Sequence, residues 1–79
     1  MDTKIYNAVK SGQADNSINF SDFQNLIVDL GFIFRRQHGS HMIYSNNKIN
    51  EYMNIQDNAG KAKDYQVKQL RKIIKKHGL

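Results

Sequence analysis

The segment that decides the fold is GFIFRRQHGSHMIY, residues 31–44. Its aromatic and β-branched beginning favours a strand over residues 32–37. The dipeptide His38-Gly39 is a tight-turn signal, and residues 40–44 are again typical of a strand. The segment therefore predicts an antiparallel hairpin.

A third strand is expected within residues 49–56, after a polar turn over residues 45–47. Two antiparallel hairpins in series form a meander. The turn-forming residues 57–60 are predicted to end the sheet.

An amphipathic helix is expected directly before the meander. Ser21 and Gln24 have the spacing of a capping box, and Gly31 supplies the stop. Apolar residues follow the i, i+3, i+4, i+7 pattern of a buried helix face, at Phe23, Leu26, Ile27 and Leu30.

A second amphipathic helix is expected after the meander, with Asp64 placed to cap it and Gly78 to stop it. Its apolar stripe consists of Val67, Leu70, Ile73 and Ile74. A three-stranded sheet with both helices on one face buries each stripe once. The predicted fold class is therefore an α+β two-layer sandwich of order α-β-β-β-α, with the second sheet face open.

Residues 1–19 add a short N-terminal helix over residues 3–11 and a polar connector to the αβββα body over residues 20–79. A chain of 79 residues is expected to form a single domain over residues 1–79. The chain has no cysteine and no apolar run of membrane-spanning length, so a cytoplasmic location is expected.

Positive charge is concentrated at the C-terminal end. The chain carries a net charge of +5, whereas residues 61–79 hold seven bases against the single acid Asp64. A localised basic patch favours a polyanionic partner such as RNA, although a solvated helix face is the plain alternative. The candidate RNA-binding residues are Lys61, Lys63, Lys68, Arg71, Lys72 and Lys75, the last four on the helix face opposite the apolar stripe.

Candidate catalytic residues are few. The chain has no Gly-rich phosphate loop and no His-x-x-x-His pair, so neither a cofactor nor a metal site is expected. Histidine is the side chain suited to proton transfer near neutral pH. Of the three histidines, His77 is expected to cap the last helix and His38 to lie in a turn.

His41 differs because it lies inside a strand, with Arg35 and Arg36 on the paired strand. Cleavage of RNA without a metal needs a group that moves the 2′-hydroxyl proton and fixed positive charge at the phosphate. His41 is therefore the candidate catalytic residue. Arg35, Arg36, Gly39 and Ser40 are candidates for supporting catalysis or for positioning the phosphate.

Residues 31–44 resemble the signature of the HicA toxins, in which a Gly-aromatic strand is followed by Gly-Ser-His and an aromatic residue. Residues 54–56, 60–63 and 65–69 are similar to the longer branch of that family. The resemblance covers residues 20–79. It implies a double-stranded-RNA-binding-domain-like fold and a metal-independent mRNA interferase with His41 as the catalytic histidine. It also implies silencing by a HicB antitoxin.

A non-catalytic nucleic-acid-binding module of the same fold is the alternative function. For the toxin, an acidic HicB-like antitoxin is expected to cover the open sheet face and to neutralise the lysines. Tyr44, Tyr52 and Met53 are candidate hydrophobic anchors for that partner, provided that they are exposed.

Overall fold

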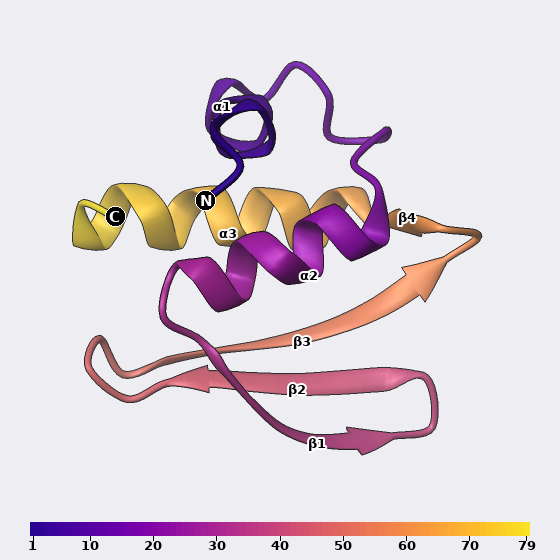
Figure 1. Ribbon diagram of the computed structural model, residues 1–79, viewed down its shortest axis with the longest axis vertical. Helices are drawn as coiled ribbons and strands as arrows, with labels where there is room; N and C mark the ends of the chain where they lie inside the picture. Colours follow the sequence, from indigo (N-terminus) through magenta and orange to yellow (C-terminus); the bar gives the residue numbers. More distant parts are fainter.

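Two helices, four strands and a final helix follow one another in the computed structural model, which describes residues 1–79. The helices are α1 (Thr3–Ser11), α2 (Phe20–Asp29) and α3 (Asp64–His77). One antiparallel sheet has the order β1-β2-β3-β4 (Figure 1) and consists of β1 (Ile33–His38), β2 (His41–Asn46), β3 (Glu51–Asn58) and β4 (Lys61–Ala62). The α+β, double-stranded-RNA-binding-domain-like fold with an additional N-terminal helix is confirmed. No helix is both long enough and apolar enough to span a bilayer.

One face of the sheet is buried and the other is open. Side chains alternate along a strand, so β2 buries Tyr44 and Asn46 while β3 buries Met53 and Ile55. Tyr44 and Met53 are direct cross-strand partners. Both α2 and α3 lie on the same side of the strands in Figure 1, as predicted.

The hydrophobic core joins the two helices to this face of the sheet. The predicted core residues Phe23, Leu26, Ile27, Leu70, Ile73 and Ile74 are buried, whereas Leu30 at the end of α2 is half-buried. The core also takes in Val9 of α1, and residues outside the apolar patterns of the helices, namely Ile18, Phe20, Phe32 and Ala62.

A short fourth strand corrects the prediction that the sheet ends at residues 57–60. Ala59 and Gly60 form a two-residue hairpin loop with φ of 53° and 87°, the signs of a type I′ turn. The Gly60 N–H donates to Asp57 Oδ1 at 2.7 Å. The turn therefore returns the chain as β4 beside β3. The pattern missed β4 because two residues are too few to show an alternation.

The end of the connector extends the sheet beyond β4. The Ala62 N–H donates to the carbonyl of Ile18, and the Phe20 N–H donates to the carbonyl of Gly60, both at 2.9 Å. Asn19 pairs with Lys61 as an isolated antiparallel bridge. The end of the connector is therefore joined to the αβββα body by backbone hydrogen bonds.

Gln66 forms hydrogen bonds with the part of the β3 edge that β4 does not cover. Its side-chain amide accepts from the Gln56 N–H at 3.3 Å and donates to the carbonyl of Asn54 at 3.2 Å. In a parallel pair of strands, one residue bonds in this way to the two residues that flank its partner. The Gln66 amide makes the same pair of bonds with the two residues that flank Ile55. Gln66 is buried, so these bonds satisfy a polar group in the interior and fix the first turn of α3 against β3.

The helix caps differ from the predicted ones. Asn19 caps α2 by accepting from the Asp22 N–H at 3.1 Å, so the capping box of Ser21 and Gln24 is wrong. Gln24 instead reaches the sheet and donates to the Tyr44 hydroxyl at 2.8 Å. α3 begins one residue earlier than expected, with Lys63 at the cap position and no side-chain cap bond. The buried Phe20 is the first residue of α2, so the helix begins before Ser21, the residue expected to cap it.

α1 lies against α2 and α3 on the side away from the strands (Figure 1). Val9 is fully buried there, and the Tyr6 hydroxyl donates to the carbonyl of Leu79 at 2.6 Å. Two bonds of 2.9 and 3.0 Å join the Arg71 guanidinium to the Asp15 carboxylate, and a third of 3.0 Å runs to the carbonyl of Val9. We therefore propose that residues 1–79 fold as one domain.

Replacement of Asp15 by Asn tests this proposal. The hydrogen bonds from Arg71 lower the pKa of Asp15 below its ordinary value of 3.8. The stabilisation is thus complete above that value and is lost as the pH falls through the folded-state pKa. Asp15→Asn should lower the free energy of unfolding at pH 7 by about 1–3 kcal/mol, because a charged hydrogen-bond partner is removed.

Urea unfolding followed by circular dichroism measures this difference as a function of pH. The difference in the free energy of unfolding between the variant and the wild type should become smaller only once the pH is below about 3.8. The pKa of Glu51 is also lowered, by its hydrogen bond with His77, and this contribution is common to both proteins. An unchanged gap at low pH would show that the ion pair is not the source of the stability.

Candidate active site on the open sheet face

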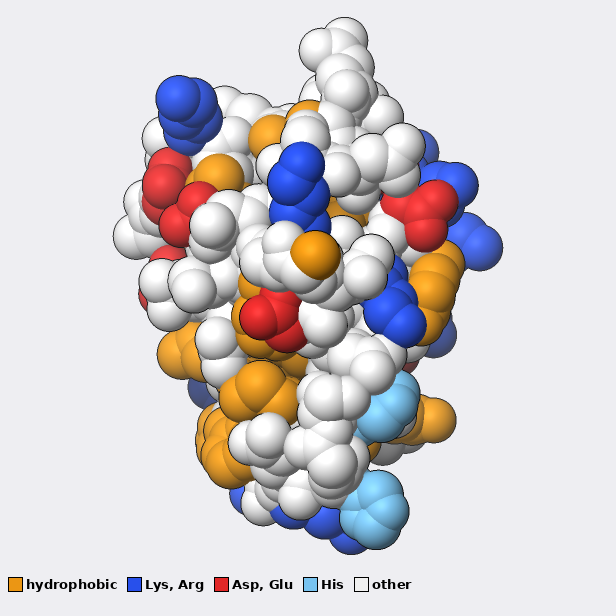
Figure 2. All heavy atoms as spheres, turned by 90° about the vertical axis from the view of Figure 1, so that its right-hand side faces the viewer, with side chains coloured by type: hydrophobic (Ala, Val, Ile, Leu, Met, Phe, Trp, Pro, Cys, Tyr) orange, Lys and Arg blue, Asp and Glu red, His pale blue; other side chains and the backbone are white.

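Alternation along the central strands places six side chains on the sheet face that no helix covers. The cross-strand pairs on this face are His41 with Gln56, Ile43 with Asn54, and Ser45 with Tyr52. Figure 2 shows two histidine side chains near each other at the lower right of the molecule, with hydrophobic and Lys or Arg side chains around them. The open face predicted from sequence therefore carries chemically active groups.

His41 is held by the turn before it and by one side chain beside it. Gly39 has φ of 61° and is followed by Ser40 in a two-residue loop, and His41 is the first residue of β2. Its Nδ1 lies 3.0 Å from Oδ1 of Asn54. An amide oxygen only accepts, so the proton of the neutral imidazole resides on Nδ1. Nε2 has no protein partner and therefore keeps a free lone pair on an exposed residue.

A β-bulge brings both arginines of β1 to the face of His41. The β1–β2 register shifts between Phe34 and Arg36, so Arg35 is the extra residue. Arg35 Nε donates to Ser45 Oγ at 2.6 Å, and Arg36 lies opposite Ile43. Strict alternation would have directed one arginine to each face of the sheet. The bulge gives both positive charges to the open face.

His41 and Arg36 line one hollow of about 510 Å³, together with His38, Ile43 and Asn54. His38 is the last residue of β1 and pairs directly with His41. It is therefore a strand residue at the site, and its prediction as a turn residue is wrong. The sequence contained the information needed to predict this pairing, because a two-residue loop at residues 39–40 places residues 38 and 41 opposite each other.

Ser40 contacts β3 and has no hydrogen bond with the imidazole. Its Oγ accepts from Gln56 Nε2 at 2.7 Å, and Gln56 is the cross-strand partner of His41. Ser40 thus ties the β1–β2 turn to β3. His77 lies at the far end of β3, where its Nε2 donates to Glu51 Oε2 at 2.8 Å. That histidine is engaged in packing α3 on the sheet.

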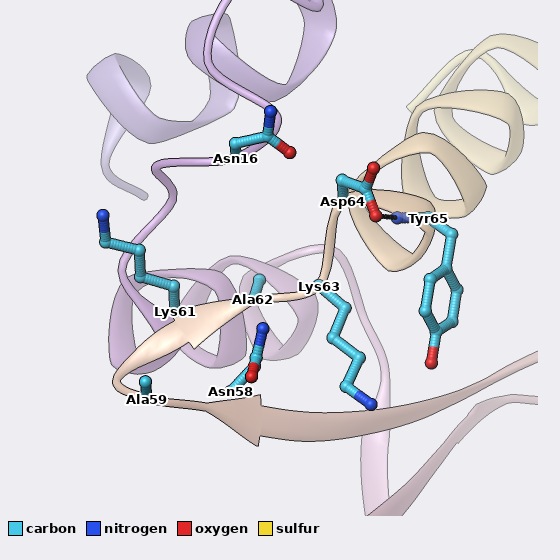
Figure 3. Close-up of a pocket in the computed structure, with 8 residues that line it drawn as sticks. All are labelled: Asn16, Asn58, Ala59, Lys61, Ala62, Lys63, Asp64 and Tyr65. Atoms are coloured by element: carbon cyan, nitrogen blue, oxygen red, sulfur yellow. Dashed lines mark hydrogen bonds between the residues drawn. The ribbon is translucent and has the colours of Figure 1, made fainter.

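The basic residues predicted to bind RNA divide into three groups. Lys61 and Lys63 line a hollow of about 700 Å³ between β4, the start of α3 and Asn16 of the connector (Figure 3). Lys68, Lys72 and Lys75 are exposed on the outermost stripe of α3. Arg71 is not on that surface, because it lies on the flank toward α1 and is bonded to Asp15. The exposure predicted for Arg71 is wrong.

The candidate anchors for a partner also change. Tyr44 and Met53 are buried under the helices, so neither can anchor a partner, whereas the Tyr52 side chain is 66% exposed on the open face. No cluster of three or more His, Cys, Asp or Glu side chains that could hold a metal ion is present.

The family model described as the HicA toxin of bacterial toxin-antitoxin systems matches residues 20–79. This chain belongs to the HicA toxin family. Searches of curated proteins and of solved structures found no match. The HicA match begins at the first residue of α2 and includes every residue of the open face. Membership makes the chain the toxin of a toxin-antitoxin system and implies an antitoxin of the HicB type as its partner.

Asn54 is expected to set the tautomer of His41. In the neutral form of the wild-type imidazole, the proton should reside on Nδ1, because Asn54 Oδ1 accepts from that atom. In Asn54→Ala this acceptor is lost, and the population should shift toward the Nε2–H tautomer. Two-bond ¹H–¹⁵N NMR correlations of the imidazole distinguish the two forms. Equal populations in both proteins would contradict the assignment.

Proposed function

We propose that this HicA toxin is an mRNA interferase, an endoribonuclease that cleaves RNA without a metal ion and so inhibits translation. The observation that carries the proposal is the His41 imidazole, which is bonded through Nδ1 to Asn54, has no protein partner at Nε2, and lines a hollow together with Arg36. A fixed base beside a fixed cation is what cleavage by the 2′-hydroxyl requires. The enzyme would act in the cytoplasm, where mRNA is translated.

The proposed reaction uses the neighbouring 2′-hydroxyl as the nucleophile. His41 Nε2 takes the proton of this hydroxyl, and O2′ forms a bond to the adjacent phosphorus. The bond from phosphorus to O5′ then breaks, and O5′ takes up a proton. The products are a 2′,3′-cyclic phosphate and a 5′-hydroxyl. A substrate with 2′-deoxy or 2′-O-methyl sugar at the cleaved position should therefore resist the enzyme.

His38 is the candidate for the second proton transfer. It is the direct cross-strand partner of His41 and lines the same hollow. A protonated imidazole there would give its proton to the departing O5′. Arg36, with Arg35 beside it, would stabilise the negative charge that develops on the phosphate oxygens. Gly39 and Ser40 would contribute by holding the turn that aligns the two histidines.

The lysines would bind the phosphates that flank the cleaved bond. Lys61 and Lys63 line the hollow at the start of α3, and Lys68, Lys72 and Lys75 continue along its outer stripe. Such contacts are sequence-independent and weaken with salt. Arg71 is omitted from this set because its guanidinium is bonded within the fold.

Leaving-group chemistry separates the roles of the two histidines. On ordinary RNA, His41→Ala and His38→Gln should each lower kcat by about 10²-fold or more. On a substrate with a 5′-bridging sulfur, the leaving thiolate needs no proton, so His38→Gln should recover most of the rate while His41→Ala should not. EDTA should not change the wild-type rate, since the mechanism uses side-chain groups only.

Labelled RNA and these purified variants test the proposal directly. A folded His41→Ala protein that cleaves as fast as the wild type would end it. If the wild type binds RNA in a salt-dependent way and leaves it intact, the chain is the non-catalytic nucleic-acid-binding module. The lysine-lined hollow is the feature that favours this second candidate.

We also propose that a HicB-like antitoxin neutralises the toxin by covering the open sheet face. An acidic partner would be attracted by the lysines, and Tyr52 offers an exposed aromatic anchor beside His41. Co-expression with the adjacent reading frame should yield a complex that purifies intact and does not cleave RNA. A complex that cleaves as fast as the free toxin would contradict occlusion.

A further inference from the structure

His41 lines a second hollow besides the one that it shares with Arg36. This second hollow has a volume of about 300 Å³ and lies on the other side of His41 from the arginines. His41 and Asn54 line both hollows, and the second is completed by Tyr52, Tyr65, Gln66 and Gln69. Tyr52 comes from β3 and Tyr65 from the first turn of α3. The strand and the helix therefore bring two aromatic rings to one depression beside the catalytic imidazole.

These two tyrosines do not serve the core. Tyr52 is 66% exposed and Tyr65 is 57% exposed, and neither hydroxyl has a hydrogen-bond partner in the protein. The other two tyrosines, Tyr6 and Tyr44, are at least half-buried and have their hydroxyls bonded. Exposed rings that gather in a hollow are typical of a recognition surface.

The hollow with the tyrosines is continuous with positive charge on both sides. Tyr65 also lines the hollow of Lys61 and Lys63, and the Lys63 Nζ lies 5.9 Å from the centre of its ring. In Figure 3 the Lys63 and Tyr65 side chains extend in the same direction, away from Asn16. On the opposite side, His41 leads to the hollow of Arg36. The three hollows thus adjoin one another through shared residues. Their order is the lysines, then the two tyrosines, then His41 and Arg36.

We propose that Tyr52 and Tyr65 form a nucleobase subsite, in which the base next to the cleaved phosphate of a single-stranded RNA stacks on an aromatic ring. This inference rests on the proposed function, because it places RNA at His41. Gln69 also lines this hollow, and its amide, which both donates and accepts, would bind a base edge. A base paired in a duplex has both faces covered by its neighbours, so the subsite selects single-stranded RNA.

Binding measurements in a His41→Ala background test the subsite without cleavage. The probe is a short fluorescein-labelled single-stranded oligoribonucleotide, followed by fluorescence anisotropy. Replacement of both tyrosines by Leu keeps apolar bulk but removes the rings, and the Kd should rise about 10- to 100-fold. Replacement of both by Phe keeps the rings and should retain binding. Val28→Ala, at a 51% exposed position on α2, is the matched surface control and should not change the Kd.

Two further measurements separate stacking from charge. The salt dependence of binding should have the same slope in the Leu variant as in its parent, whereas Lys61→Gln should reduce the slope. An RNA that is abasic at the nucleotide next to the cleavage position should bind the parent weakly, and the Leu substitutions should then add no further loss.

Three results would overturn the subsite. They are an unchanged Kd in the Leu variant, a duplex RNA bound as tightly as the single strand, and a Leu variant that loses only its affinity for the antitoxin. The last result would assign the rings to the protein partner. The outcome is independent of the cleavage assay: RNA that stacks on the tyrosines and is never cut would refute the nuclease and leave the subsite standing.

Discussion

The burial of Tyr44 against Met53 is the contact on which the rest of the structure depends. These two residues form a cross-strand pair beneath the helices, and a slip of one residue in either strand would turn that strand's buried residue outward. With this register fixed, the alternate residues must face the other way. His41 and Asn54 reach the open face for that reason, and their hydrogen bond follows from the same register. Core packing and site geometry are thus one constraint.

Local departures from regular structure complete the site. The bulge at Arg35 breaks the alternation of β1 and gives both arginines to the face of His41. At the opposite edge, the Gln66 amide takes the place of a missing strand and fixes the start of α3 against β3. That contact also positions Tyr65, the residue before it. The first departure places both arginines on the open face, and the second fixes the turn of α3 whose Tyr65 lines a hollow with His41.

The N-terminal segment explains why the basic helix is less uniform than its sequence indicates. The outer face of α3 is expected to carry a continuous series of cations, but α1 and the connector draw Arg71 inward through Asp15 and the carbonyl of Val9. The hydrogen bonds with Asp15 raise the pKa of Arg71, and the carboxylate pairs with the charge of the guanidinium. The lysines beside it stay in solvent and available to a polyanion.

The sequence by itself determined the two amphipathic helices, the hairpin around Gly39 and the likeness to HicA toxins, because periodicity, turn chemistry and a local motif are properties of neighbouring residues. It singled out His41 for the same reason. It did not reveal β4, the partner of Arg71, the pairing of His41 with Asn54 or the meeting of Tyr52 with Tyr65. Those contacts join residues distant in the chain, and only the packing of α1 and α3 and the register of β3 decide which of them meet.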